Sequence, residues 1–317
     1  MRLSLLLLAL LLTLGCRAEP DMASPTLAPV VAVADTLPPA PSTLPEDAAV
    51  EAATRATFRT LMAQATAEDW AALPMDTLVQ TVGTALVGVP YVDGLLDADA
   101  TETLVLNLSA FDCVLFVEHA LALAQGLAVG DTTFAGFARR VEALRYRDGL
   151  RDGYASRLHY FSDWLRDNAA RTQVTLLDPP GAEPYAKPID FMTTHRTSYR
   201  KLAPEAPASD SLLAALQGVE AQLSAQPALA MLPQERIADA YPALRPGDVI
   251  ATTTSIDGLD VTHTGFVVTT ADGGTGFLHA SSTGAVKVSP DLQAYIEGNA
   301  VQTGVLVARP VDPRTGS

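Results

Sequence analysis

Cys113 is the residue of this chain whose type and setting point most directly to chemistry. The 317 residues include two cysteines, Cys16 and Cys113, and Cys16 lies near the N-terminus. If Cys16 is lipidated or removed, no disulfide can form within the chain. Cys113 is then either a buried apolar residue or a thiol kept for its reactivity. A nucleophilic cysteine reacts as the thiolate, and its ordinary pKa of about 8.5 leaves it mostly protonated at neutral pH.

The elements expected around Cys113 supply one device that lowers a thiol pKa. The stretch "TLVLNLSAF" (residues 103–111) predicts a β-strand that runs directly into Asp112 and Cys113. Residues 114–125 are apolar at nearly every position, which predicts a buried helix with Gly126 as its C-terminal cap. The positive end of this helix favours a thiolate at Cys113. We expect Asp112 to cap the helix and to have no catalytic part.

A second device, a neighbouring imidazolium, must come from one of five histidines. The segments "LDVTHTGFVVTT" and "GFLHASS" are joined by "ADGGT" and predict a β-hairpin with a glycine-rich turn. Alternation along its strands brings His263 and His279 close enough for one imidazole to orient the other, directly or with a slight offset. Gly265 is expected to leave room for a substrate or for the cysteine helix. The alternative is that both histidines are core residues with satisfied hydrogen bonds.

The order of the expected elements predicts an α+β fold. Helices are expected at 48–65 and 69–86, and strands dominate the last third of the chain, from "LRPGDVIATTT" to "GVLVARP". Helices followed by antiparallel strands are typical of this class. Between these helices and the strands of the last third lie a polar and aromatic stretch and a further expected helix at 209–225. These segments predict a large helical and loop insertion.

The first 18 residues predict a signal peptide. A positive start at Arg2 precedes about a dozen apolar residues, which are too few to span a bilayer permanently. Gly15-Cys16 resembles a bacterial lipoprotein cleavage site with Cys16 lipidated, although Leu14 stands where such sites usually have a small residue. Ordinary cleavage after Ala18 is the alternative. We therefore expect export to the periplasm and a lipid anchor as the chain's contact with a membrane.

Composition divides the remaining chain. Residues 19–50 are rich in proline and alanine and contain no aromatic residue, which predicts a disordered linker. Residues 51–312 have the pattern of one globular domain. The net charge of −15 argues against nucleic-acid binding that depends on clustered cations. Glu118-His119 is not a zinc motif, because the second histidine of an H-E-x-x-H helix is absent, and we expect no metal or cofactor.

Several motifs carry a family resemblance. Cys113 in "FDCVLFVE", then "PGDVI", His263 in "HTGFVV" and His279 in "FLHASS" resemble, in chain order, the NlpC-type branch of the papain-like cysteine hydrolases, which act on bacterial cell walls. "GVPYVDGLL", "LVLNLSAFDC", "RYRDG", "YASRLHYFSDWLRDN" and "GLDVTHTGF" resemble its N-acetylmuramoyl-L-alanine amidase-like subfamily, over about 81–310. The 150 residues between Cys113 and His263 exceed the spacing in small NlpC-type enzymes, and the subfamily shares this insertion.

The resemblance implies a fold and an activity. The expected fold is a papain-like core in which catalytic Cys113, at a helix N-terminus, packs on an antiparallel β-sheet. His263 is the expected base and His279 its orienting residue. The implied reaction is hydrolysis of the amide between N-acetylmuramic acid and L-alanine in peptidoglycan fragments, with anhydro-muropeptides as the preferred substrate and an acyl-enzyme as intermediate.

Three more residues are candidates for substrate binding. Tyr91 in "VPYVDG" resembles a tyrosine that lines the NlpC-type active site, and plain packing is its alternative role. Arg157 and His159 are candidates for binding the carboxylates of muropeptide stems, since a guanidinium matches a carboxylate with two hydrogen bonds. The alternative is that Arg157 pairs with Asp163 or Asp167 and holds the insertion together.

Three other functions remain open. The first is an endopeptidase that cuts the D-glutamyl-diaminopimelate bond, as smaller NlpC-type proteins do. The second is a zinc amidase, whose three ligands would have to come from scattered histidines and carboxylates. The third is a tethered wall-binding module with an inactive site.

Overall fold

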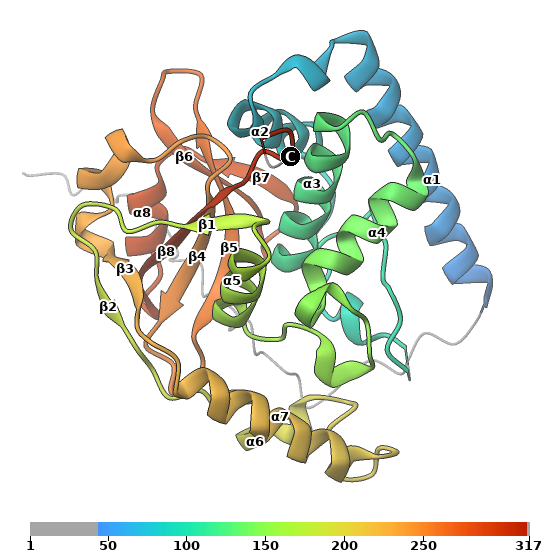
Figure 1. Cartoon of the computed structure of the whole chain (residues 1–317), viewed down its shortest axis with the longest axis vertical. Helices are drawn as coiled ribbons and strands as arrows, with labels where there is room; N and C mark the ends of the chain where they lie inside the picture. The colour runs from blue at the N-terminus through green and yellow to red at the C-terminus, as the bar shows by residue number, and fades with distance from the viewer. Residues whose placement is uncertain (1–43, 100, 316–317) are drawn as a thin grey trace, which may run out of the picture.

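The computed structural model describes residues 44–99 and 101–315 (Figure 1). The predicted signal peptide, the lipidation candidate Cys16 and the predicted linker up to residue 43 lie outside the described residues. The last part of the predicted linker, 44–50, belongs to the first helix, α1 (Leu44–Ala67). That helix begins four residues before the expected start at 48.

The helices that precede the sheet differ in detail from the prediction. They are α1, α2 (Met75–Ala85), α3 (Cys113–Ala128) and α4 (Phe134–Arg145). The single helix expected over 69–86 is a 3₁₀ turn, Trp70–Ala72, followed by α2, because Pro74 lacks an N–H group and stands at the N-cap of α2. Gly126 does not cap α3. It lies inside the helix, where a Cβ atom would come within 2.9 Å of the Asp131 carbonyl oxygen.

The strand expected at 103–111 is absent, because side chains hold this loop in place of a ladder. The Asn107 backbone N–H donates to His119 Nε2 at 3.2 Å, and the Leu108 N–H donates to the buried Thr54 hydroxyl at 3.1 Å. Its only regular pairing is an isolated bridge between Phe111 and Tyr91. The loop therefore delivers the chain to Cys113 through tertiary contacts, which the apolar pattern does not reveal.

An antiparallel sheet forms the other half of the described structure and confirms the α+β class. Its main path is β2-β3-β8-β4-β5-β6-β7, and β1 pairs with β8. The strands are β1 (Val174–Leu176), β2 (Glu183–Tyr185), β3 (Leu229–Pro233), β4 (Val249–Thr254), β5 (Val261–Thr269), β6 (Thr275–Ala280), β7 (Val286–Ser289) and β8 (Gln302–Pro310). The predicted hairpin is β5–β6, and the last strand, β8, lies inside the sheet between β3 and β4.

Alternate residues of the strands enter two apolar clusters on opposite faces of the sheet. Phe266 and Leu278 belong to the cluster that packs under α2, α3 and α4. Val267 and Phe277 belong to the cluster around Leu292 of α8 (Leu292–Glu297). In Figure 1, α3 lies against the sheet, and α1 and α4 lie on the side of α3 that faces away from the sheet. The helix that begins at Cys113 is thus clamped between the sheet and other helices, and nearly all its residues are buried.

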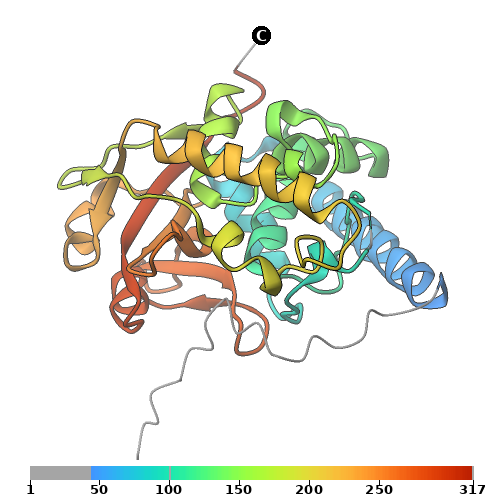
Figure 2. The same ribbon diagram turned by 90° about the horizontal axis from the view of Figure 1, so that it is seen from below.

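The segment between α4 and β4 carries the expected insertion. It contains α5 (Phe161–Ala170), α6 (Phe191–Thr194) and α7 (Ser209–Ser224) together with β1, β2 and β3. Short 3₁₀ turns occupy Leu95–Asp97, Arg147–Gly149, Tyr154–Ser156, Arg196–Ser198, Gln234–Arg236 and Ala238–Ala243. Figure 2 shows α7 and its preceding loop crossing one end of the molecule, beside the segment that follows α2. None of the helices in the described residues combines the length and apolar character needed to cross a membrane.

Candidate active site

Cys113 is the first residue of α3 and lies at its positively polarised end. The Asp112 side chain accepts a hydrogen bond from the Leu115 backbone N–H at 2.7 Å, so Asp112 is the expected N-cap. Burial raises the pKa of Asp112 to about 6, against the opposite effect of the Leu115 N–H. The Cys113 side chain is a free thiol and the residue is 7% exposed.

The hairpin holds its two histidines with an offset. The β5–β6 ladder starts at the pair Phe266–Leu278, so His263 lies ahead of the ladder while His279 lies just beyond it on β6. A Cβ atom at Gly265 would approach the Leu278 carbonyl oxygen to 2.5 Å and His279 Cβ to 2.9 Å. The space at Gly265 is therefore filled by β6, which corrects the expectation that it receives a substrate or the cysteine helix.

His263 and His279 are joined in a hydrogen-bonded chain that continues to Ser289. His263 Nε2 and His279 Nδ1 are 2.8 Å apart, and His279 Nε2 lies 3.0 Å from the Ser289 hydroxyl. If His263 becomes protonated, both its nitrogens carry hydrogen, so Nε2 must donate and His279 Nδ1 must accept. Neutral His279 then donates from Nε2 to Ser289. This arrangement leaves His263 Nδ1 as the nitrogen available to exchange a proton.

Cys113 lies beside this pair of histidines. The backbone N–H of Thr264, the residue next to His263, favours the Cys113 thiolate, and α3 packs against β5, the strand that carries both Thr264 and His263. Tyr295 of α8 packs its ring 6.0 Å from the His263 ring and 4.6 Å from the His279 ring, centroid to centroid. Burial, and then the negative charge of a Cys113 thiolate, raise the pKa of Tyr295. Tyr295 thus packs against both histidines of the hairpin.

A charge on Cys113 would also act on Tyr91. Burial raises the pKa of its phenol, and a thiolate at Cys113 raises it further. The Tyr91 ring is half-buried against the cluster that contains α3. The backbone fixes its position, since the Tyr91 N–H donates to the Gly284 carbonyl oxygen at 2.8 Å.

Burial decides the protonation of the free site. It raises the pKa of the Cys113 thiol to about 12, and the neighbouring Asp112 adds to this effect. Burial also lowers the pKa of His263 to about 4 and that of His279 to about 2. The N–H groups of Thr264, Cys113 and Val114 favour the thiolate as predicted for a helix start, but desolvation outweighs them. The resting site therefore holds a neutral thiol beside neutral imidazoles.

The side chains of Arg157 and His159 bind other groups of this chain. The Arg157 side chain is 5% exposed and lies 2.6 Å from Asp97 Oδ1 and 3.6 Å from Glu102 Oε1. Asp163 and Asp167, the two partners that the sequence offered as alternatives, bind Arg147 and Arg171 instead. His159 Nε2 donates to the Tyr154 carbonyl oxygen at 2.8 Å.

The Glu118-His119 pair has structural partners. Glu118 forms a fully buried ion pair with Arg145 at 2.7 Å, and His119 Nδ1 donates to the Leu115 carbonyl oxygen at 2.7 Å. Within 44–99 and 101–315, no three histidine, cysteine, aspartate or glutamate side chains are arranged to hold a metal ion.

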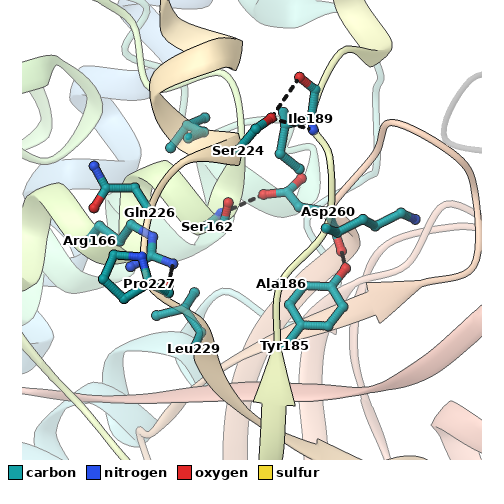
Figure 3. Close-up of a pocket in the computed structure, with 12 residues that line it drawn as sticks. Ser162, Arg166, Tyr185, Ala186, Ile189, Ser224, Gln226, Pro227, Leu229 and Asp260 are labelled. Atoms are coloured by element: carbon teal, nitrogen blue, oxygen red, sulfur yellow. Dashed lines mark hydrogen bonds between the residues drawn. The ribbon is translucent and has the colours of Figure 1, made fainter.

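A small hollow between α5, α7 and the sheet is structural (Figure 3). Its volume of about 20 Å³ accommodates a single water molecule. Its polar groups bind one another: Asp260 Oδ2 accepts from the Ser162 N–H at 2.7 Å, and the Tyr185 hydroxyl donates to the Asp260 carbonyl oxygen at 2.8 Å.

Two residues of the site were missed by sequence reasoning. Ser289 ends β7, and Tyr295 lies on a short helix; neither residue type is distinctive in such a place. Alternation along β7 would have put Ser289 and Lys287 on one face, and the register of β6 and β7 places Lys287 opposite His279. A predicted β6–β7 pairing was the one signal that could have indicated Ser289.

Comparison with known proteins shows which family the chain resembles. The model of the AmiA-like, N-acetylmuramoyl-L-alanine amidase-like family matches residues 81–304. A crystal structure of an N-acetylmuramoyl-L-alanine amidase from Bacteroides uniformis is 33% identical, with a TM-score of 0.68, and the match covers 74% of this chain and 98% of that one. A protein from Bacteroides fragilis described as a presumed xylanase is 34% identical, with a TM-score of 0.63, covering 72% and 99%.

A structure from Legionella pneumophila, 18% identical, shares the fold, with a TM-score of 0.62 and coverage of 83% of this chain and 96% of that one. The search of curated proteins finds no match. The family model spans both Cys113 and the hairpin with its two histidines. The chain belongs to the AmiA-like family of N-acetylmuramoyl-L-alanine amidase-like proteins.

Proposed function

We propose that this protein is a cysteine-dependent N-acetylmuramoyl-L-alanine amidase of the NlpC-type, papain-like group. The hydrogen-bonded chain from His263 through His279 to Ser289, with Cys113 beside it at a helix N-terminus, is the observation that carries the proposal. This is the arrangement of a nucleophile, a base and a group that orients the base. The family and the Bacteroides uniformis neighbour support an amide bond as the target.

In the proposed reaction the thiol proton moves to His263 Nδ1 as the Cys113 sulfur attacks the carbonyl carbon. Proton transfer accompanies the attack because the Cys113 thiol and the His263 imidazole are both neutral before substrate binds. The charge on His263 is stabilised by His279, whose Nδ1 accepts a hydrogen bond from His263 Nε2 and whose Nε2 donates one to the Ser289 hydroxyl. The backbone N–H at the start of α3 stabilises the developing oxyanion.

Collapse of the tetrahedral adduct breaks the carbon–nitrogen bond. His263 returns its proton to the departing alanine amine, which leaves the lactyl group as a thioester on Cys113. Water then gives a proton to His263 and attacks the thioester, and the carboxylic acid leaves as the thiol is restored. A glycosidase would instead need two carboxylates flanking the scissile bond. The proposed set of Cys113, His263 and His279 contains no carboxylate, and Asp112, next to Cys113 in the chain, is occupied as the cap of α3.

The family supports a peptidoglycan-type substrate, and the proposal names anhydro-muropeptides as the preferred fragments. Wild type and Cys113→Ser are incubated with a defined anhydro-muropeptide, and products are identified by mass spectrometry. Intact stem peptide formed by wild type alone supports the amidase. A sugar-linked L-Ala-D-Glu product would mean the endopeptidase, and binding without turnover would mean an inactive wall-binding module.

Export with a lipid anchor on Cys16 is part of the proposal, resting on the leader sequence. Radiolabelled palmitate should enter the wild-type protein expressed in a bacterium with a lipoprotein pathway, and it should not enter Cys16→Ser. A mature chain that starts after Ala18 and carries no label would replace the anchor with ordinary secretion.

A further inference from the structure

The ladder between β4 and β5 contains an extra residue directly before His263. Thr252 is paired with His263, and the next residue of β4, Thr253, is paired with Val261. Thr262 therefore has no opposite residue on β4. This irregularity is a β-bulge, in which two residues of one strand face a single residue of the other. Bulges change the direction of nearby side chains and are frequent beside active sites.

The bulge reverses the alternation of side chains along β5. Val267 belongs to the apolar cluster around α8, whereas Val261 packs against the cluster under α2, α3 and α4. The two positions are an even number of residues apart, so a strand without a bulge would place both on one face. His263 follows the alternation of Val267, and its ring lies beside Tyr295 of α8 and His279. The bulge is therefore what separates the direction of His263 from that of Val261.

The Thr252 hydroxyl contacts both residues of the bulge. It donates to the His263 carbonyl oxygen at 3.2 Å, and its oxygen lies 3.2 Å from the Thr262 hydroxyl. A hydroxyl has a single hydrogen, so Thr262 is the donor in the second contact. Thr252 is fully buried and Thr262 is 6% exposed. One buried side chain of β4 thus holds the extra residue and the backbone of His263 together.

Asp260 fixes β5 on the other side of the bulge. Its Oδ2 accepts from the Ser162 N–H at 2.7 Å, in the first turn of α5, where the helix dipole favours a negative group (Figure 3). Its Oδ1 accepts from the Val261 N–H at 2.8 Å, and its carbonyl oxygen accepts from the Tyr185 hydroxyl at 2.8 Å. The strand before the bulge is thus held by α5 and β2, and the ladder with β4 holds it afterwards. The extra residue cannot be removed by sliding of the strand.

We propose that Thr252 is a positioning residue whose hydroxyl holds the bulge at Thr262 and thereby orients the His263 imidazole toward His279. It acts through the backbone of His263, since its own side chain is fully buried. This inference deepens the proposed amidase function and rests on it, because it takes His263 as the base. A displacement of about 1 Å in a catalytic group is enough to reduce turnover strongly.

Steady-state kinetics on a defined anhydro-muropeptide tests this role in the full chain. Thr252→Val keeps the branched shape and removes the hydroxyl, so kcat should fall about 10-fold or more while KM stays within about 2-fold. Thr252→Ser keeps the hydroxyl and should have a kcat within about 3-fold of wild type. Thr253→Val is the matched control, because the equally buried Thr253 hydroxyl binds Thr303 on β8 at 2.9 Å. Its kcat should equal that of wild type.

Proton NMR separates this role from the amidase reaction. Imidazole N–H hydrogens in buried hydrogen bonds exchange slowly with water, and the signals absent from His279→Phe belong to the chain of His263, His279 and Ser289. These signals should persist in Thr252→Ser and Thr253→Val and should be shifted or lost in Thr252→Val.

Wild-type signals in Thr252→Val would overturn the proposal, and so would an equal loss of kcat in Thr252→Val and Thr253→Val. If the wild-type protein does not cleave the muropeptide, the amidase function fails while the NMR comparison still decides whether Thr252 orients His263.

Discussion

His263 Nε2 lies 2.8 Å from His279 Nδ1, and the two rings are nearly perpendicular. The contact occupies one nitrogen of His263 and fixes which nitrogen remains for proton exchange. His279 is fully buried, so its ring is held between Phe277 and Tyr295 and cannot rotate freely. A base oriented in this way is pre-organised before substrate arrives.

Loss of the His279 ring nitrogens should therefore impair turnover far more than binding. His279→Phe keeps an aromatic ring in the stack but removes both hydrogen bonds. We expect kcat to fall about 10²-fold or more, with KM changed little. Steady-state kinetics on a defined muropeptide measures this. His279→Gln, which restores an acceptor, should recover part of kcat. Wild-type kcat in His279→Phe would show that the histidine pair is only structural.

The Ser289 hydroxyl should have a smaller effect through the same chain. Ser289→Ala removes one hydrogen bond to His279 Nε2, at 3.0 Å, and leaves the ring packed. A neutral hydrogen bond of this kind is worth about 1 kcal/mol, so kcat should fall about 3- to 10-fold. Ser281→Ala is the matched control, because the Ser281 hydroxyl binds Thr283. Equal effects of the two variants would remove Ser289 from the site.

The burial of Cys113 predicts an unusual pH dependence of alkylation. Its pKa is raised to about 12 and that of His263 lowered to about 4, so neither group is charged between these values. Only the thiolate reacts, and its fraction increases as pH rises toward the thiol pKa. In a Cys16→Ser chain, the rate with iodoacetamide should rise about 10-fold per pH unit from pH 6 to 9.

The control for this measurement is the same chain unfolded in urea, where the thiol regains a pKa of about 8.5 and should react faster at pH 7. A rate that is high and flat from pH 5 to 9 in the folded protein would indicate a thiolate–imidazolium pair. In that case the helix N-terminus would outweigh desolvation, opposite to the balance that the structure shows.

Sequence reasoning was most accurate where local pattern determines structure. The run of apolar residues after Cys113 forms a buried helix, and the segments with His263 and His279 form one hairpin. Both patterns depend on short-range periodicity. The loop 103–111 has the same apolar alternation as a strand, yet Thr54 and His119, distant in the sequence, bind its backbone. Periodicity carries no information on such partners.

The substrate-binding candidates show the same limit. Arg157 was assigned by its residue type, whereas its partners Asp97 and Glu102 lie more than fifty residues earlier in the chain. Pairing across that distance depends on how the insertion folds back on the segment after α2. Asp163, which the sequence suggested as a partner of Arg157, forms its ion pair with Arg147, ten residues before Arg157.

The partners of Arg157 predict that its loss destabilises the fold. Arg157→Met leaves the buried Glu102 and the 35% exposed Asp97 with Lys201 as their neighbouring cation, so it should cost about 2–3 kcal/mol, less than the roughly 3–5 kcal/mol typical of a buried charge that loses its only partner. Urea unfolding at pH 7 measures this. Arg151→Met is the comparison, since the Arg151 and Glu142 side chains are 38% and 32% exposed and solvent screens their 3.2 Å pair, so the cost should be about 1 kcal/mol or less. If Arg157→Met instead raised KM while stability stayed at the wild-type value, Arg157 would be a substrate-binding residue. The buried position of its guanidinium favours the first outcome, because no carboxylate of a substrate needs to reach it for its charge to be neutralised.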